Sequence, residues 1–259
     1  MPPATHITAA ADLASSEVDA FFKEVKPVRG TRLALADGGA SSLGLSRTVH
    51  HEFMTKLQSE AYTTVKQNDQ FHLQRLDRGA LKALGLKAQA DCLRLSGTFQ
   101  APPARVHQLL NDYTVRAQWD KAVHPDSDSN ILTHTVAPQK SRQVLRTLTN
   151  AVMGGLITAR EFIDCAQTQH LDGGLIQHLA ASVTVDQFPI TKSAVRGTNF
   201  PCGMIYTPGD DGQSTHLEYI IHSDIGGWLP QSVVSKGTTN ALWDIAETVS
   251  HYLATTADS

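Results

Sequence analysis

The chain has 259 residues, which is enough for one large domain or two small ones. Its formal net charge of -3 argues against a nucleic-acid partner, because phosphate binding depends on clustered lysine and arginine. Cys92, Cys165 and Cys202 are too widely spaced for a disulfide framework or a zinc site. Isolated thiols of this kind are typical of a reducing compartment.

The first residues have the composition of neither a secretory signal nor a mitochondrial presequence. They lack a basic segment followed by an apolar one, and Asp12, Glu17 and Asp19 precede the first lysine. Nowhere does the chain approach the roughly 18 apolar residues that a membrane span needs. We therefore expect a cytoplasmic protein.

Residues 1–45 are predicted to be an N-terminal extension. Val18, Phe21, Phe22 and Val25 have the spacing of one helix face. The stretch "LADGGASSLG" that follows has the composition of a linker. We expect this short amphipathic helix to pack on the main domain, and contact with a partner or a membrane is the alternative.

From about residue 46 the pattern becomes regular. "SRTVHHEFMTKLQSEAYTTV" predicts a helix that passes into a strand, and "FHLQRLDR" and "DCLRLSGTFQ" predict two further strands. "APPARVHQLLNDYTVRAQWDKAV" predicts a helix, because its proline pair suits a helix entry and an apolar stripe follows.

Six more strands are predicted after this helix. Their sequences are "NILTHTVA", "RQVLRTLTN", "REFIDCAQTQ", "LIQHLAASVTV", "CGMIYTP" and "HLEYIIHSD". Turn-forming residues separate them, such as Gly154-Gly155 and the run of Pro, Gly and Asp at 208–212. Because no helix lies between these strands, they predict an antiparallel sheet.

The last element is a long helix predicted over residues 231–254. One face at helical spacing is formed by Val234, Thr238, Ala241, Ile245, Val249 and Tyr252, with Leu242 and Leu253 at its edge. Trp243 falls opposite this face. At about 1.5 Å per residue the helix spans roughly 35 Å, enough to cross a domain. The predicted architecture is α+β, a large antiparallel sheet over one long C-terminal helix.

The order of these elements resembles that of the START domain, the steroidogenic acute regulatory protein-related lipid transfer family. The resemblance rests on "LRLSGTFQAPPARVHQLLNDYTVRAQWD", "TAREFIDC", "VRGTNFPCGMIYTP" and "THLEYIIHSDIGGWLP". It covers about residues 46–255 and is strongest from 158 to 230. The Asp-x-x-Gly-Trp-Leu-Pro run before the final helix most resembles the sterol- and carotenoid-carrying branch.

This resemblance implies a helix-grip fold, in which a curved sheet of about nine strands surrounds the C-terminal helix. A tunnel between sheet and helix would hold one hydrophobic ligand: a sterol, a carotenoid or another isoprenoid lipid. Trp228, Leu229 and Pro230 would seat the helix. The expected lining residues are Met153 and Leu156 in a lid loop at 150–159, Tyr219, Ile221 and His222 in the wall, and Ala241, Leu242 and Ile245 in the roof.

Arg160 is the polar residue that the resemblance singles out. Sterol-type members often pair this arginine with an acid in the preceding strand, and we match that strand to Ser141, Arg142 and Gln143, which contain no acid. We therefore predict that Arg160 lies near Ser141 and Gln143 and shares its donors between water and a ligand oxygen. An Arg160 that pairs elsewhere or faces solvent is the alternative.

No catalytic pattern accompanies these features. "HHEF" at 50–53 is not the His-Glu-x-x-His of zinc proteases, and no Gly-x-Ser-x-Gly motif occurs. We therefore predict a monomeric lipid carrier, not an enzyme, that needs no metal or cofactor and contacts a membrane surface transiently. A phospholipid carrier and a helix-grip enzyme acting on a small apolar substrate are the alternatives.

Overall fold

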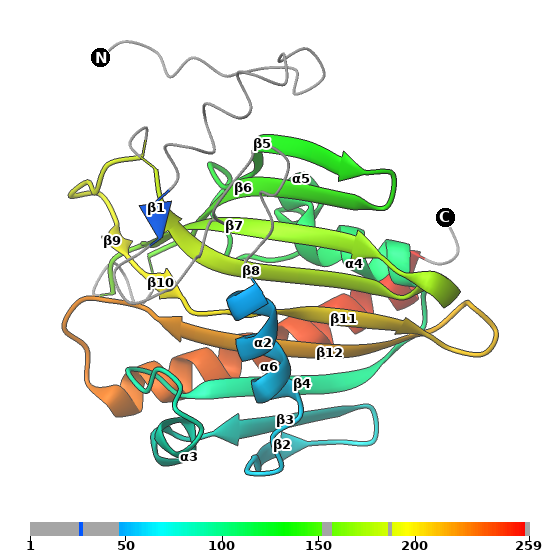
Figure 1. The fold of residues 1–259 in the computed structure, drawn as a ribbon, viewed down its shortest axis with the longest axis horizontal. Coiled ribbons are helices and arrows are strands. Elements are labelled where there is room, and N and C mark those ends of the chain that lie inside the picture. The colour runs from blue at the N-terminus through cyan, green and yellow to red at the C-terminus, as the bar shows by residue number, and fades with distance from the viewer. Residues whose placement is uncertain (1–25, 28–46, 152–156, 186–187, 257–259) are drawn as a thin grey trace.

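A computed structural model describes residues 26–27, 47–151, 157–185 and 188–256 (Figure 1). Nine strands form one continuous sheet in the order β2-β3-β4-β12-β11-β8-β7-β6-β5, and every neighbouring pair on this path is antiparallel. The strands are β2 (Thr63–Gln67), β3 (Phe71–Leu76), β4 (Cys92–Phe99), β5 (Asp128–Ala137), β6 (Lys140–Leu148), β7 (Arg160–His170), β8 (Ile176–Thr184), β11 (Cys202–Pro208) and β12 (Thr215–Asp224). The predicted antiparallel sheet is thereby confirmed.

Three short strands extend this sheet at its margins. They are β1 (Lys26–Pro27), which pairs with β8, β9 (Val195–Arg196), which pairs with β7, and β10 (Thr198–Asn199), which pairs with β12. Because β4 lies beside β12, strands from the two ends of the domain are neighbours in the middle of the sheet.

Helices cover both faces of the sheet. They are α2 (Arg47–Leu57), α3 (Arg78–Ala83), α4 (Pro103–Asn111), α5 (Tyr113–Arg116) and α6 (Gln231–Thr256), with a short turn of 3-10 helix, η2 (Asp172–Gly174). In Figure 1, α6 runs behind the sheet and α2 lies in front of it. We call the side that faces α6 the inner face and the side that faces α2 the outer face.

Two of these helices correct the sequence interpretation. The single helix predicted around residues 101–123 is divided at Asp112, whose backbone is extended and whose carboxylate accepts a hydrogen bond from the Thr114 amide at 3.0 Å. Helix α3 was not predicted; Asp77 caps it by accepting from the amide of Ala80 at 2.8 Å. In both places an aspartate satisfies amide groups that a helix start leaves free.

Alternate residues of the central strands pack into two separate cores. On the inner face, Leu95, Tyr206 and Leu217 pack against α4 and α6. On the outer face, Leu179 and Ile220 pack against Phe53 of α2. Since successive side chains of a strand point to opposite faces, a central strand such as β12 contributes to both cores.

The face of α6 that packs on the sheet differs from the predicted one. Its buried residues are Thr239, Leu242, Trp243, Ala246, Val249 and Leu253. Ala241, predicted to line the ligand, is exposed, whereas Trp243, predicted to lie opposite, is only 2% exposed. Burying an indole removes far more apolar surface from water than burying a methyl group, which explains the rotation of the helix.

Residues 16–25, where a short helix is predicted, lie outside the described residues, so the division at residue 45 stays a prediction. Trp228 also departs from expectation. It is 93% exposed, so it does not seat α6.

Candidate functional site

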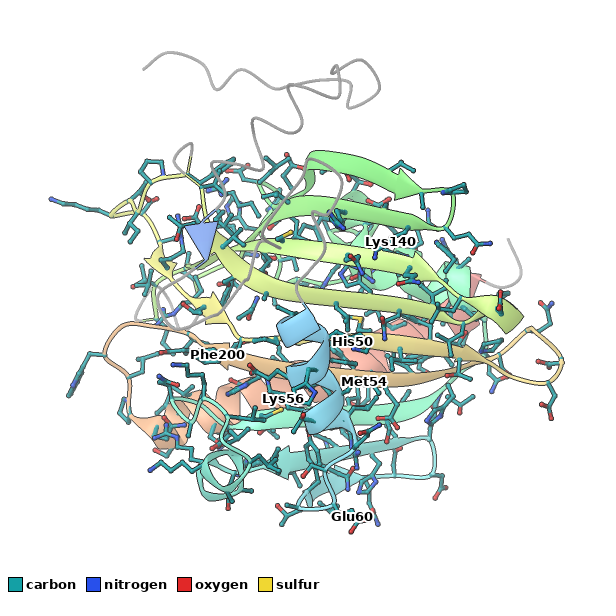
Figure 2. All side chains as sticks on the ribbon, in the orientation of Figure 1. His50, Met54, Lys56, Glu60, Lys140 and Phe200 are labelled. Carbon is teal, nitrogen blue, oxygen red and sulfur yellow. The ribbon has the colours of Figure 1, made fainter. Side chains whose placement is uncertain are left out.

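Helix α2 places a buried lysine against the outer face of the sheet. Lys56 is 0% exposed, and its ammonium group donates to the carbonyl of Pro201 at 2.7 Å and pairs with Glu52 at 2.9 Å (Figure 2). His222 packs beside this group with its ring centroid 4.6 Å from that of Phe200. Burial, followed by the charge of Lys56, lowers the pKa of His222 to about 3.

His222 was predicted to face the tunnel, and that prediction is wrong. Ile220, two residues earlier in β12, packs in the outer core, so His222 shares the outer face. Tyr219 and Ile221 occupy the alternate positions and pack in the inner core, and their contact with a ligand stays a prediction. Leu242 is buried there too, and Ile245 is half-buried against it.

The inner face is mainly apolar but carries paired polar groups. The Tyr113 hydroxyl and the Thr147 hydroxyl lie 2.5 Å apart, and Asn111 donates to the Tyr206 hydroxyl at 2.7 Å. His178 shares a hydrogen bond of 2.8 Å with Thr168. A largely apolar wall with a few fixed polar groups is the usual lining of a ligand site.

Two histidines of this face are held in the neutral form. The rings of His107 in α4 and His178 in β8 are 5.5 Å apart, edge to face. Burial lowers the pKa of His178 to about 3 and that of His107 to about 4. Charge repulsion from His107 adds to the lowering at His178, and charge repulsion from His170 adds to the lowering at His107. At neutral pH both rings therefore act as uncharged hydrogen-bonding groups.

A row of polar side chains crosses the inner face near the Gly226 end of the sheet. Asp164 of β7 accepts from the Ser182 hydroxyl at 2.6 Å and from the Asn199 amide at 2.8 Å. The Ser223 hydroxyl in turn donates to the Asn199 side-chain oxygen at 2.5 Å. Burial raises the pKa of Asp164 to about 6, and these hydrogen bonds oppose the rise.

Arg160 does not lie near Ser141 and Gln143. In the β6–β7 ladder Ser141 opposes Thr168 and Gln143 opposes Ala166, whereas Leu148 opposes Glu161, the neighbour of Arg160. At about 3.3 Å per residue, Gln143 is displaced along the strand by roughly 20 Å and Ser141 by roughly 26 Å. The prediction failed because the register of the two strands depends on pairing that local sequence does not reveal.

The guanidinium group of Arg160 instead holds two loops. It donates to the carbonyl of Thr158 and, at 3.3 Å, to that of Ile225, and its backbone amide donates to the Thr149 hydroxyl at 2.9 Å. The next residue, Glu161, lies on the outer face and pairs with Arg146 and Arg196, each at 2.7 Å. Among the described residues, the partners of the Arg160 guanidinium group are thus backbone carbonyls, not a carboxylate.

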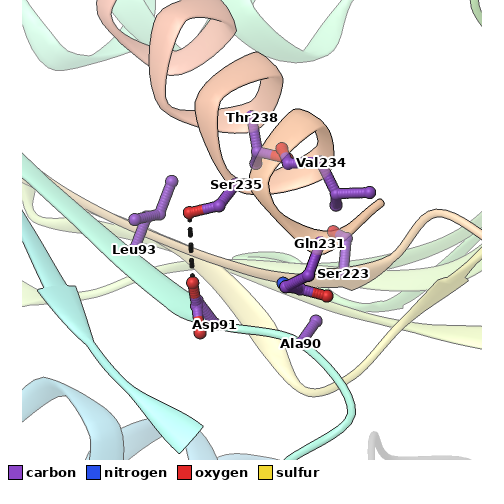
Figure 3. Close-up of a pocket in the computed structure, with 8 residues that line it drawn as sticks. All are labelled: Ala90, Asp91, Leu93, Ser223, Gln231, Val234, Ser235 and Thr238. Atoms are coloured by element: carbon purple, nitrogen blue, oxygen red, sulfur yellow. Dashed lines mark hydrogen bonds between the residues drawn. The ribbon is translucent and has the colours of Figure 1, made fainter. Parts of the chain in front are cut away.

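A crevice lies between the start of α6 and the ends of β4 and β12 (Figure 3). Its empty space is about 270 Å³, part of which is open to solvent. Apolar groups come from Ala90, Leu93 and Val234, and polar groups come from Asp91, Ser223 and Gln231. Asp91 accepts from the Ser235 hydroxyl of α6 at 3.2 Å, which joins the helix to the sheet across the crevice.

Two predicted lining residues, Met153 and Leu156, lie outside the described residues, as do residues 152–156 of the predicted lid. Asp164, Ser182, Asn199 and Ser223 were not predicted. Their alternation with buried apolar positions in two strands is visible in the sequence, but nothing in it aligns the four residues across the sheet.

No helix in the described part of the chain has both the length and the apolar character needed to cross a bilayer. Across the same residues, no three His, Cys, Asp or Glu side chains gather as a metal site would require.

Comparison of the sequence with known proteins identifies a matching protein family. The START domain family model matches residues 57–255. StAR-related lipid transfer protein 5 of Bos taurus is 34% identical over 124 residues, or 48% of this chain and 55% of the relative. StAR-related lipid transfer protein 6 of Homo sapiens is 23% identical over 151 residues, or 58% of this chain and 66% of that relative. The chain thus spans about half to two thirds of the length of these relatives.

Solved structures agree on the fold. Human StAR-related lipid transfer protein 5 superposes with a TM-score of 0.65 at 20% identity, covering 78% of this chain and 91% of that chain. Human STARD10 superposes with a TM-score of 0.66 at 15% identity, covering 85% of this chain and 84% of the other. These likenesses confirm the predicted α+β helix-grip fold, and with the family match they show that the chain belongs to the START domain family.

Proposed function

We propose that the protein is a carrier that binds one hydrophobic ligand between its sheet and α6 and releases it unchanged. The observation that carries this proposal is the inner face, a broad apolar wall with paired polar groups under a single long helix. The printed names of its relatives describe lipid transfer, which supports the same function here. Within that class we favour a sterol, a carotenoid or another isoprenoid, and a phospholipid is the alternative.

The proposed ligand contacts follow the inner face. Tyr219, Ile221, Leu242 and Ile245 form the apolar part, and Ser141 and Gln143 offer polar groups on β6. We keep Arg160, Met153 and Leu156 as proposed contacts near the lid. We also propose that the carrier is a monomer in the cytoplasm, whose reducing conditions suit its three free, buried thiols.

The carrier proposal predicts one lipid per chain after incubation with vesicles made from a total membrane lipid extract. The expected result is a one-to-one lipid adduct in native mass spectrometry, with the same mass for the lipid before and after binding. Absence of any adduct would contradict the carrier. A changed lipid mass would instead favour an enzyme.

We further propose that Trp228 makes the transient membrane contact. Trp228 is 93% exposed and Ile190 is 76% exposed, and their loops lie at the same end of the sheet (Figure 1). An indole ring on a protein surface suits the interface between lipid headgroups and acyl chains.

Replacing Trp228 by serine is therefore expected to slow lipid exchange between vesicles about tenfold, without changing the amount of lipid bound at equilibrium. Leu171→Ser, which alters an exposed leucine after β7 at the other end of that strand from Arg160, is the matched control. Equal exchange rates for both variants and the unmodified protein would reject this contact.

A further inference from the structure

The row of polar side chains on the inner face, Asp164, Ser182, Asn199 and Ser223, ends in the crevice under α6. This connection determines whether the crevice offers hydrogen-bond donors or acceptors to a ligand. Ser223 belongs to both the row and the crevice. Its hydroxyl donates to Asn199, and the residue also lines the crevice. The row therefore links a buried carboxylate to a space that a ligand group can enter.

The direction of every hydrogen bond in this row is set by Asp164. An ionised carboxylate only accepts, so the side chains of Ser182 and Asn199 must donate to it, at 2.6 and 2.8 Å. With its nitrogen turned to Asp164, the Asn199 amide presents its oxygen to Ser223, which must donate in turn, at 2.5 Å. The single hydroxyl proton of Ser223 is then used, and only its lone pairs remain for the crevice.

The other polar groups of the crevice also provide hydrogen-bond acceptors. Asp91 contributes a second acceptor, and Gln231 contributes an amide that both donates and accepts. The enclosed part of the crevice is about 10 Å³, close to the room that one water molecule needs. It therefore suits a single small polar group such as a hydroxyl, and the apolar remainder of a ligand would have to lie outside it, along the inner face.

We propose that this crevice is the recognition site for a ligand hydroxyl group, with Ser223 accepting the hydrogen bond and Asp164 acting as the positioning residue that makes Ser223 an acceptor. The proposal rests on the carrier function and narrows its ligand to a lipid alcohol. Ketones, ethers and esters of the same skeleton lack the donor and leave the free lone pairs of the Ser223 oxygen unfilled, which costs binding free energy.

Asp164 affects ligand selectivity through the row of hydrogen bonds that ends at Ser223, without contacting the ligand itself. An amide in its place both donates and accepts, so in Asp164→Asn the whole row can reverse. Ser223 would then accept from Asn199 and turn its own proton to the crevice. This variant is therefore expected to gain lipids that only accept, which loss of packing alone would not produce.

The test uses one membrane lipid extract in two portions, one untreated and one with its hydroxyl groups converted to methyl ethers. The full-length protein is incubated with vesicles of each portion, re-isolated, and its bound lipid is quantified by mass spectrometry. The unmodified protein is expected to retain about tenfold more of a lipid alcohol than of its methyl ether. In Ser223→Ala and Asp164→Asn this ratio is expected to approach one.

Ser96→Ala is the matched control, because Ser96 lies in β4 on the outer face, next to the inner-face residue Leu95. It is expected to keep the tenfold ratio. Ser223→Ala removes a single hydroxyl, so it also serves if Asp164→Asn does not fold.

An unchanged ratio in Ser223→Ala would overturn the proposal, as would equal retention of alcohol and ether by the unmodified protein. Loss of the ratio in Arg160→Met, but not in Ser223→Ala, would overturn it as well and assign the polar end to Arg160. No lipid from either portion would instead contradict the carrier function itself.

Discussion

Replacement of Trp243 by alanine is expected to destabilise the domain by about 3–5 kcal/mol, the usual cost of removing a buried large aromatic side chain. Trp243 is 2% exposed and lies in the middle of α6. Its ring meets that of Phe71 nearly at right angles at 6.4 Å, and the ammonium group of Lys66 lies 4.3 Å from its centre. The variant therefore loses packing with the sheet together with a cation–π contact.

The measurement is urea unfolding at pH 7.5, followed by far-ultraviolet circular dichroism. Trp228→Ala is the matched control, because it removes the same side chain from a position that is 93% exposed, and it is expected to change the free energy of unfolding by less than about 0.5 kcal/mol. Similar losses in the two variants would show that Trp243 does not hold α6 on the sheet.

Acidification is expected to destabilise the protein through its buried histidines. The pKa of His178 is lowered by burial to about 3, against an ordinary value of 6.5. The folded state therefore resists a proton that the unfolded state takes up, so the stability due to neutral His178 is present above pH 6.5 and is lost as the pH falls towards 3. Between pH 7 and pH 4 this loss amounts to about 3 kcal/mol for His178 alone.

Between pH 7 and pH 4, the free energy of unfolding of His178→Gln is expected to fall by about 3 kcal/mol less than that of the unmodified protein, because glutamine does not titrate. Urea unfolding at half-unit steps of pH measures the difference between the two curves. His222, whose pKa is also lowered to about 3, is expected to behave alike in His222→Gln. Parallel curves for the unmodified protein and both variants would contradict the prediction.

Asp164 supplies a control of opposite sign. Burial raises its pKa from 3.8 to about 6, so its contribution to stability is present below pH 3.8 and is lost as the pH rises through 6. Asp164→Asn removes this contribution. The variant is therefore expected to lose about 2 kcal/mol more of its free energy of unfolding between pH 7 and pH 4 than the unmodified protein loses. A flatter curve would mean that Asp164 is not protonated in the folded state.

The sequence by itself determined the long C-terminal helix and most of the strands of this fold. The predicted final helix, residues 231–254, begins where α6 begins and ends two residues before Thr256. Segments predicted as strands from "FHLQRLDR" to "HLEYIIHSD" all contain strands. These features are local, because a period of two or of 3.6 residues and the turn residues between elements are read within a few positions.

Only the tertiary structure decided which faces and which partners these elements have. His222 and Tyr219 lie in one strand, yet a choice of face places the first under α2 and the second under α6. The register of β6 with β7 separates Arg160 from Ser141 and Gln143, and the pairing of four strands brings Asp164 to Ser182, Asn199 and Ser223. A shift of one residue along a strand reverses every face, and the contacts that prevent it join segments far apart in the chain, so no local pattern records them.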